Sequence, residues 1–91
     1  MHPKLAALVQ RLDLERIEDN IFRGYHPPKE TGRLYGGQIM AQALIAAGRT
    51  VPEDRPPHSL HGYFLRPGDP SAPVLFEVER IRDGRSFSTR R

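Results

Sequence analysis

The sequence predicts an α+β domain, in which one short apolar helix packs against an antiparallel sheet. Two observations predict this class. Residues 36–50 read as a helix with apolar side chains around most of its circumference, and a helix of that kind belongs in a core. Residues 58–65, 74–81 and 86–91 then read as consecutive strands joined by turn residues, which is typical of an antiparallel sheet.

Residues 3–14 are expected to form a helix that precedes this core. Pro3 suits the first helical turn, where its missing N–H forms no helical hydrogen bond in any case. The apolar residues of the segment have the i, i+3, i+4, i+7 spacing of one helical stripe, formed by Leu5, Leu8, Val9 and Leu12. We expect this stripe to pack on a neighbouring surface.

Residues 17–25 are expected to form the first strand, which Gly24 ends. A polar loop over residues 26–35 leads to the apolar helix, whose alanines allow a sheet to approach its backbone closely. Pro52 prevents this helix from continuing, because proline lacks the N–H and clashes with the preceding turn.

The next strand is expected over residues 58–65. Its aromatic and apolar mass comes from Leu60, Tyr63, Phe64 and Leu65. Of these, Tyr63 and Phe64 are expected in the core rather than in an acyl pocket. The breaker residues of the segment Pro67-Gly68-Asp69-Pro70 end the strand.

Residues 74–81 form the clearest strand of the sequence. They alternate, with Val74, Phe76 and Val78 on one face and acidic residues on the other. Asp83-Gly84 is a pair favoured in two-residue type I′ turns, so we expect a hairpin with a return strand over residues 86–91.

A short helix followed directly by strands is the sequence pattern of a hot-dog fold, in which the helix lies against an antiparallel sheet. The last strand stops at Arg91, which leaves the four-strand sheet with an exposed edge, and such edges pair with other strands. We therefore expect residues 1–91 to be one hot-dog unit that is incomplete in its sheet. The chain would be a fragment of a longer polypeptide, or another chain would complete it.

The composition excludes several classes. At 91 residues the chain is one domain at most, and its 37% hydrophobic and 27% charged residues suit a globular segment. No cysteine is present, so neither a disulfide framework nor a thiolate zinc site can form, which is compatible with a cytoplasmic location. No apolar run approaches the roughly 20 residues that span a bilayer. We expect no membrane insertion, no metal and no cofactor.

The net charge of +3 is compatible with an anionic partner. The arginines are spread along the chain with acidic residues between them, whereas a duplex-binding surface would gather them on one face. Nucleic acid is therefore not the expected partner.

Three segments resemble the type II acyl-CoA thioesterases, the TesB-like family: FRGYHPP, YGGQIMAQALIAAGRTVPEDRPPHSLHGYFLRPGD and FEVERIRDGRSFSTRR. The motifs GGQ, PEDRPPHSLH and FLRPGD occur in the family order and close to the family spacing, and RDGRSFSTRR matches the family's hairpin. The resemblance runs from about Leu8 onward and concerns the N-terminal half of the family.

The resemblance implies two tandem hot-dog units that hydrolyse fatty acyl-CoA to fatty acid and CoA. It also implies a catalytic group of Asp, Ser or Thr, and Gln in the second unit, which lies beyond residue 91. Gln38 and Asp69 have matching residue types but lie in the first unit, so these roles are not assigned to them. The chain alone is expected to be inactive or nearly so.

His58 is the catalytic candidate within the chain. The resemblance links a histidine at this place to activity, and a neutral imidazole can accept the proton of an attacking water at neutral pH. The alternative is a hydrogen-bonded structural histidine. His61 lies three residues on, which places it on the opposite face of a strand, so the two should share neither a ligand nor a metal.

The candidate substrate-binding residues are Gly36, Gly37, Gln38 and Arg66. Backbone N–H groups at a helix N-terminus can bind a carbonyl oxygen or phosphate, although two glycines also simply permit a close turn. Gln38 could bind a ligand or cap the helix. Arg66 and Arg33 could bind CoA phosphates through charge-assisted hydrogen bonds.

The sequence thus predicts part of an oligomeric acyl-CoA thioesterase, whose partners are acyl-CoA and a second hot-dog unit or another chain. One alternative is a non-catalytic half that binds acyl-CoA or mediates dimerisation. A weak nucleic-acid binder is the other alternative, and its affinity would fall steeply with salt.

Overall fold

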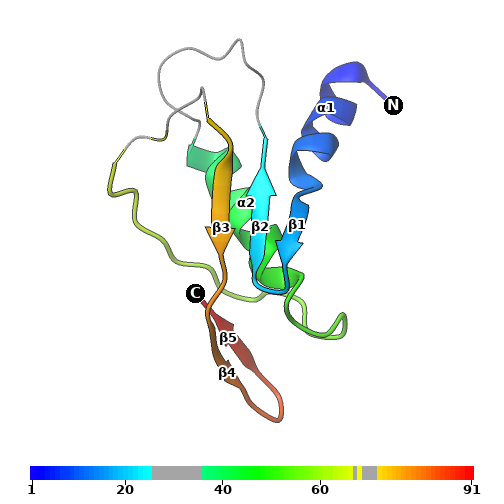
Figure 1. Cartoon of the computed structure of the whole chain (residues 1–91). Helices are drawn as coiled ribbons and strands as arrows, with labels where there is room; N and C mark the ends of the chain where they lie inside the picture. Colours follow the sequence, from blue (N-terminus) through cyan, green and yellow to red (C-terminus); the bar gives the residue numbers. More distant parts are fainter. Residues whose placement is uncertain (26–35, 67, 69–71) are drawn as a thin grey trace.

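The structure is a computed structural model that describes residues 1–25, 36–66, 68 and 72–91. The described elements are, in chain order, α1 (Pro3–Leu12), β1 (Glu15–Glu18), β2 (Ile21–Gly24), α2 (Gly36–Gly48), β3 (Val74–Glu77), β4 (Arg80–Asp83) and β5 (Ser88–Arg90). In Figure 1, α2 crosses behind the sheet of β1, β2 and β3, and the β4–β5 hairpin extends from one end of that sheet. The α+β class and the central helix are therefore as predicted.

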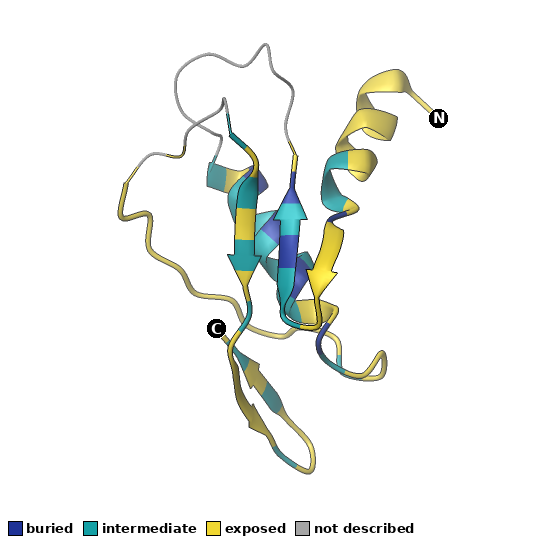
Figure 2. Cartoon of the chain, viewed as in Figure 1, coloured by how far each residue is buried: buried dark blue, intermediate teal, exposed yellow. Residues whose placement is uncertain are grey.

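Helix α1 confirms the predicted first helix. His2 precedes it, and the Nδ1 atom of that ring accepts a hydrogen bond from the N–H of Lys4 at 3.1 Å. The expected packing of its apolar stripe is wrong for the described residues, because Leu5, Leu8 and Val9 are exposed and α1 has no buried residue. The stripe is exposed because little of the chain packs against it: α1 contacts α2 mainly near the C-terminal end of α1 (Figure 2).

Helix α2 confirms the predicted central helix, but its most buried face is not apolar. The buried residues follow i, i+4, i+8 spacing and are Gln38, Gln42 and Ala46. Gln42 is 1% exposed, and its Nε2 donates to the carbonyl oxygen of Arg11 at 3.0 Å. Gly24 of β2 makes room for it, since a Cβ at Gly24 would lie 3.0 Å from that Nε2 atom.

The single strand predicted over residues 17–25 is wrong. The chain forms two antiparallel strands here, β1 and β2, with Glu15 opposite Arg23 and Arg16 opposite Phe22. Asp19 and Asn20 lie between them, and these residue types favour turns because their side chains bond to their own backbone. Strand β2 then pairs antiparallel with β3, with Phe22 opposite Phe76.

The core lies where α2 meets this sheet. Phe22 and Ala46 are each 1% exposed and Leu14 is 5% exposed. The partly buried residues packed against them are Ile45, Phe76 and Val78, and Figure 2 shows the burial concentrated in β2 and the helix behind it. The predicted face of Val74, Phe76 and Val78 is confirmed, since all three are half-buried while Glu77 is exposed.

The strand predicted over residues 74–81 is divided into β3 and β4. At the division the chain changes partners: the N–H of Val78 donates to Asn20 at 2.7 Å, while Glu79 exchanges two backbone hydrogen bonds with Arg91 at 2.6 and 2.9 Å. The result is a three-stranded and a two-stranded sheet rather than the expected four-strand sheet.

The predicted hairpin is present, but its two-residue Asp-Gly turn is wrong. Asp83 belongs to β4 and pairs with Ser88 of β5, so four residues connect the strands. The N–H of Gly84 donates to the carbonyl oxygen of Phe87 at 2.7 Å and closes the loop. Pairing to Ser88 extends β4 by one residue into the predicted turn.

The strand predicted over residues 58–65 is also wrong. These residues form no strand, and Leu60, Tyr63, Phe64 and Leu65 are between 51% and 89% exposed instead of forming core. Aromatic residues favour a strand only when another strand supplies hydrogen bonds and packing, and β1–β5 pair elsewhere. The segment instead contacts α2, where a Cβ at Gly62 would lie 3.0 Å from the sulfur of Met40.

Candidate functional site

The first turn of α2 holds three of the predicted substrate-binding residues. Gly36 begins the helix beneath the ring of Phe64, and a Cβ at this position would lie 3.1 Å from the ring's Cζ atom. Gly37 is exposed. The first N–H groups of a helix lack helical acceptors and carry partial positive charge, and no acidic side chain lies in this turn. The turn can therefore receive an oxygen atom that carries partial negative charge.

Gln38 completes this turn but points into the protein. It is 7% exposed, and its Oε1 accepts a hydrogen bond from Nη1 of Arg11 at 3.3 Å, which connects α2 to α1. Its Nε2 atom is buried and has no hydrogen-bond partner among the residues that the structure describes. Leaving a buried donor unsatisfied costs about 1–3 kcal/mol. This unsatisfied amide belongs to the predicted binding turn itself.

Arg66 follows by two residues Phe64, whose ring contacts the start of α2. Its side chain is exposed, and it forms no ion pair with the residues that the structure describes. Arg33 and Asp69, which also entered the sequence argument, lie outside the described residues.

His58 lies elsewhere. Its ring meets the ring of Phe87 edge to face, with centroids 5.4 Å apart and planes at 75°. Phe87 belongs to the loop between β4 and β5. His61 instead contacts Tyr63 at 4.8 Å, so the two histidines have different ring partners. The prediction that His58 and His61 lie on opposite faces of a strand is wrong, because residues 58–65 form no strand.

The structure does not bring His58 to the Gly36-Gly37-Gln38 turn. Phe64 contacts Gly36 at the start of α2, whereas His58 contacts the hairpin loop. These two places lie at opposite ends of the helix in Figure 1. Six extended residues span at most about 20 Å, so the chain from His58 to Phe64 is long enough to run from the hairpin loop to the start of α2.

A network of two arginines, missed by the sequence argument, fastens the hairpin beside His58. Arg55 donates to Oγ of Ser88 at 2.6 Å and to the carbonyl oxygens of Gly84 and Arg85 at 2.8 and 3.0 Å. Arg90 donates to Oγ1 and the carbonyl oxygen of Thr50 at 2.7 and 3.0 Å. No local motif distinguishes these arginines from solvated ones, because the acceptors that hold the hairpin to the rest of the chain are 29 to 40 residues away.

Asp83 belongs to the same network. Its Oδ1 accepts hydrogen bonds from Ser88 and Arg90, each at 2.8 Å. The Ser88 hydroxyl and then the Arg90 guanidinium hold the pKa of the Asp83 carboxyl below its ordinary 3.8. The network therefore favours the ionised form of this side chain.

The stability that Asp83 contributes should disappear in acid. A carboxyl whose pKa is lower in the folded than in the unfolded state stabilises the fold above its ordinary pKa, and this contribution is lost as the pH falls through the folded-state value. We expect Asp83→Asn to unfold at a lower temperature than the wild type near neutral pH, and the gap to be smaller at a pH below the ordinary 3.8, where the carboxyl of the folded protein begins to take up its proton. Thermal unfolding of both proteins measures it. A gap that is equal at the two pH values would contradict the assignment.

A second charged cluster lies on the face of the sheet away from α2. Arg23 binds both carboxylate oxygens of Glu15 at 2.8 and 2.9 Å, and the hydroxyl of Tyr25 donates to Glu15 at 2.7 Å. Tyr25 and then Arg23 lower the pKa of Glu15, while the carboxylate raises the pKa of Tyr25. Glu15 stands opposite Arg23, so the cluster reinforces the pairing of β1 and β2.

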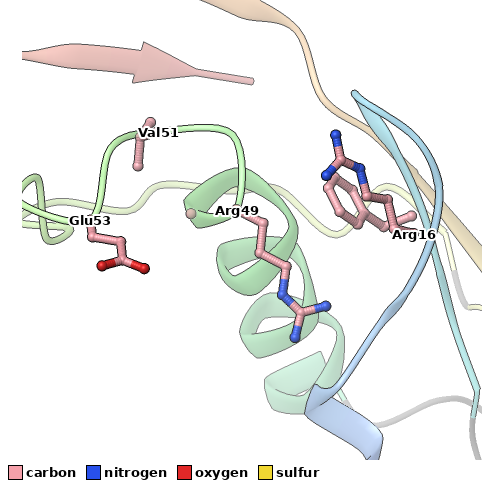
Figure 3. Close-up of a pocket in the computed structure, with 6 residues that line it drawn as sticks. Arg16, Arg49, Val51 and Glu53 are labelled. Carbon is pink, nitrogen blue, oxygen red and sulfur yellow. The ribbon is translucent and has the colours of Figure 1, made fainter.

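A cavity of about 410 Å³ lies between β1 and the end of α2 (Figure 3), lined by Arg16, Phe22, Gly48, Arg49, Val51 and Glu53. Both of its arginines already have acceptors. Arg16 pairs with Asp19, and Arg49 bonds to Asp13 at 2.9 Å and to the carbonyl oxygen of Leu14 at 2.8 Å. The cavity contains none of the predicted site residues.

In the part of the chain that the structure describes, no three His, Cys, Asp or Glu side chains are grouped so that they could hold a metal ion. No helix among the same residues has the length and apolar character needed to cross a membrane.

Comparison with known proteins decides the family. Residues 25–91 match the model of the acyl-CoA thioesterase N-terminal domain. The chain belongs to this family. Among its relatives, acyl-coenzyme A thioesterase 8 of Homo sapiens is 54% identical over 79 residues, and acyl-CoA thioesterase 2 of Haemophilus influenzae is 49% identical over 81 residues. These matches cover 87% and 89% of the chain but 25% and 28% of the relatives.

Solved structures of the family agree with the fold. The tesB protein of Mycobacterium avium subs paratuberculosis matches with a TM-score of 0.88 and 48% identity, over 94% of this chain and 34% of that one. The acyl-CoA thioesterase II TesB2 of Mycobacterium marinum matches with a TM-score of 0.81 and 49% identity, over 92% and 30% of the two chains. The predicted hot-dog class and the TesB-like resemblance are confirmed, and the chain spans a quarter to a third of these relatives.

Proposed function

We propose that this chain is the N-terminal hot-dog unit of an acyl-CoA thioesterase that hydrolyses fatty acyl-CoA to fatty acid and CoA. The observation that supports it most strongly is the sustained likeness to proteins of that name, 54% identity over 87% of the chain in one case. In the reaction, water adds to the thioester carbonyl carbon, the carbon–sulfur bond breaks, and the departing CoA sulfur takes up a proton.

The role of this unit in the proposal is to bind the substrate. The exposed N–H of Gly37 and its neighbour Gly36 would receive the thioester carbonyl oxygen, where negative charge develops during attack. The buried Nε2 of Gln38 is a further donor, and no group in the described part of the chain accepts a hydrogen bond from it. Arg66 would bind an anionic part of the substrate near the same end of α2.

The separation of His58 from this turn argues that His58 does not act there. A general base must come within about 3 Å of the proton that it takes, or reach it through one water. His58 contacts the hairpin loop instead. We therefore propose that the residues activating water belong to the second unit of the parent protein, and that the 91-residue chain alone turns over little or no substrate.

Thiol release from a panel of acyl-CoA substrates tests this proposal, together with binding of a non-hydrolysable thioether analogue of acyl-CoA. We expect the chain to bind the analogue without releasing thiol, and Gly37→Val to weaken binding. Turnover that His58→Ala abolishes and the matched His61→Ala retains would show that this unit has its own chemistry. The absence of both analogue binding and turnover would refute the proposed substrate-binding role.

A non-catalytic unit that binds acyl-CoA or mediates dimerisation is the second candidate. The exposed apolar residues of α1 and of residues 60–65 favour it, because they suit contact with another chain. We further propose that the protein is cytoplasmic and oligomeric. Analytical ultracentrifugation at several concentrations tests the oligomer, and a purely monomeric chain whose parent is also monomeric would contradict it.

A further inference from the structure

The β4–β5 hairpin carries the positive charge of the molecule. Residues 80–91 contain five arginines and one aspartate, a net charge of +4, whereas the whole chain has +3. The even spread of arginines read from the sequence therefore does not hold in this part of the fold. Arg55 adds to the concentration, since it bonds directly to the hairpin loop.

A cavity of about 390 Å³ opens between this hairpin and the chain that follows α2. Its lining combines three guanidinium groups with one carboxylate, and consists of Thr50, Pro52, Arg55, Arg80, Asp83, Gly84 and Arg90. It is separate from the first turn of α2 and from the cavity in Figure 3, which has other lining residues. It contains none of the residues assigned to substrate binding above.

Two of the four charged groups neutralise each other. Arg90 has a side chain only 5% exposed and lies 2.8 Å from Asp83, so this pair contributes little net charge to the cavity. Asp83 is further satisfied by the Ser88 hydroxyl. The uncompensated charges are therefore those of Arg55 and Arg80.

Arg55 and Arg80 differ in what they offer. The acceptors of Arg55 are a hydroxyl and two carbonyl oxygens, which hold its guanidinium in place without cancelling its charge. Arg80 donates from Nε to the side-chain oxygen of Asn20 at 2.7 Å. The two terminal nitrogens of Arg80 have no hydrogen-bond partner among the described residues.

We propose that this cavity binds a phosphate group, with the terminal N–H groups of Arg80 as donors and the fixed charge of Arg55 beside them. Guanidinium forks match the oxygens of a phosphate, and hydrogen bonds between ionised groups are stronger than neutral ones. The phosphate can belong to CoA, which rests on the proposed function, or can be free inorganic phosphate. The chemistry of the site is the same for both.

Calorimetric titration of the 91-residue chain with inorganic phosphate, CoA, dephospho-CoA and pantetheine tests the site. We expect Arg80→Gln to weaken binding of the phosphate-bearing ligands about tenfold or more, the usual effect of losing a charged hydrogen bond. Arg85→Gln is the matched control, because it removes the same charge from the same hairpin but does not line the cavity. It should change affinity less than about twofold.

The ligands distinguish the sources of the phosphate. CoA binding more tightly than dephospho-CoA, with the difference lost in Arg80→Gln, would identify the 3′-phosphate of CoA. Equal binding of inorganic phosphate and CoA would identify a general phosphate site. Phosphate binding without acyl-CoA analogue binding would uphold this site while the proposed function fails.

Three results would overturn the proposal. The first is the absence of phosphate binding. The second is an equal loss of phosphate affinity in Arg80→Gln and Arg85→Gln. The third is oligonucleotide binding that both substitutions weaken equally, which would indicate a diffuse polyanion-binding surface. Asn20→Ala separates structure from binding, since it removes the Arg80–Asn20 hydrogen bond but keeps the guanidinium, and it should retain phosphate binding. If Arg80→Gln does not fold, the side-chain Nε–H resonance of Arg80 in the wild-type chain should still move on phosphate titration, and an unmoved resonance refutes the site.

Discussion

Phe22→Ala should lower the free energy of unfolding by about 3–5 kcal/mol, the usual cost of removing a buried phenylalanine side chain. Phe22 is 1% exposed and lies in the core with Leu14 and Ala46, where β2 faces α2. A domain of this length has a total stability on the order of 5–14 kcal/mol. At the lower end of this range the variant would be close to unfolding at room temperature, and urea denaturation followed by circular dichroism measures the loss.

Leu75→Ala is the matched control for this prediction. Leu75 lies on the neighbouring strand β3 but on the opposite face of the sheet, and it is 59% exposed. Its truncation should change the free energy of unfolding by less than about 1 kcal/mol. A loss as large as that of Phe22→Ala would contradict the assignment of the core to one face and would indicate that another chain covers the outer face.

The elements that the sequence predicted well are those whose signals are local. The helix Gly36–Gly48 follows from apolar residues around most of its circumference and from Pro52 beyond it, and the alternation of Val74, Phe76 and Val78 correctly identified the face toward α2. Helix periodicity and strand alternation are short-range properties of the backbone. They require no knowledge of the partner element.

The buried glutamines of α2 could not be predicted in this way. Gln42 is buried because Gly24 leaves space for its amide and the carbonyl oxygen of Arg11 accepts its hydrogen bond. Both groups come from segments far away in the chain. A polar side chain at a helical position reads as exposed unless such a partner is known.

The strand predicted over residues 58–65 failed for a related reason. The residue types favour a strand, but a strand exists only as part of a ladder, and no described strand pairs with this segment. Of the two turns, the one at Asp19-Asn20 was missed altogether, and the other was misjudged by one residue, since Asp83 was placed in the turn that it precedes. Register depends on cross-strand pairs that the sequence shows poorly.

The sequence named candidate site residues but did not give their arrangement. Gly36 begins α2 beside the ring of Phe64, while His58 lies with Phe87 at the hairpin. The sequence could place His58 near the start of a segment but could not show what it touches. The cavity of Arg55 and Arg80 depends on contacts between residues 50–55 and 80–90, and no short motif encodes such contacts.

Arg90→Met should lower the free energy of unfolding by about 2–3 kcal/mol, the range for losing hydrogen bonds to a charged group. The Arg90 side chain is 5% exposed, and it joins Thr50 at the end of α2 to Asp83 of the hairpin. Methionine is flexible enough to occupy the space left by the arginine stem, but the carbonyl oxygen of Thr50 would lose its donor. Asp83 is half exposed, so water can compensate part of the loss, which keeps the expected cost below that of a fully buried pair.

Arg91→Met separates this effect from a general loss of charge in the hairpin. Arg91 pairs with Glu79 at 2.7 Å, but its side chain is 78% exposed, and such surface ion pairs contribute about 0–1 kcal/mol. Urea denaturation should therefore rank the two adjacent variants clearly apart. Amide hydrogen exchange should show the same ranking locally, with residues 80–90 losing protection in Arg90→Met while β2 keeps it at low denaturant. Equal effects of the two substitutions would mean that the hairpin holds its place without the contact to Thr50, and would contradict the structural role assigned to Arg90.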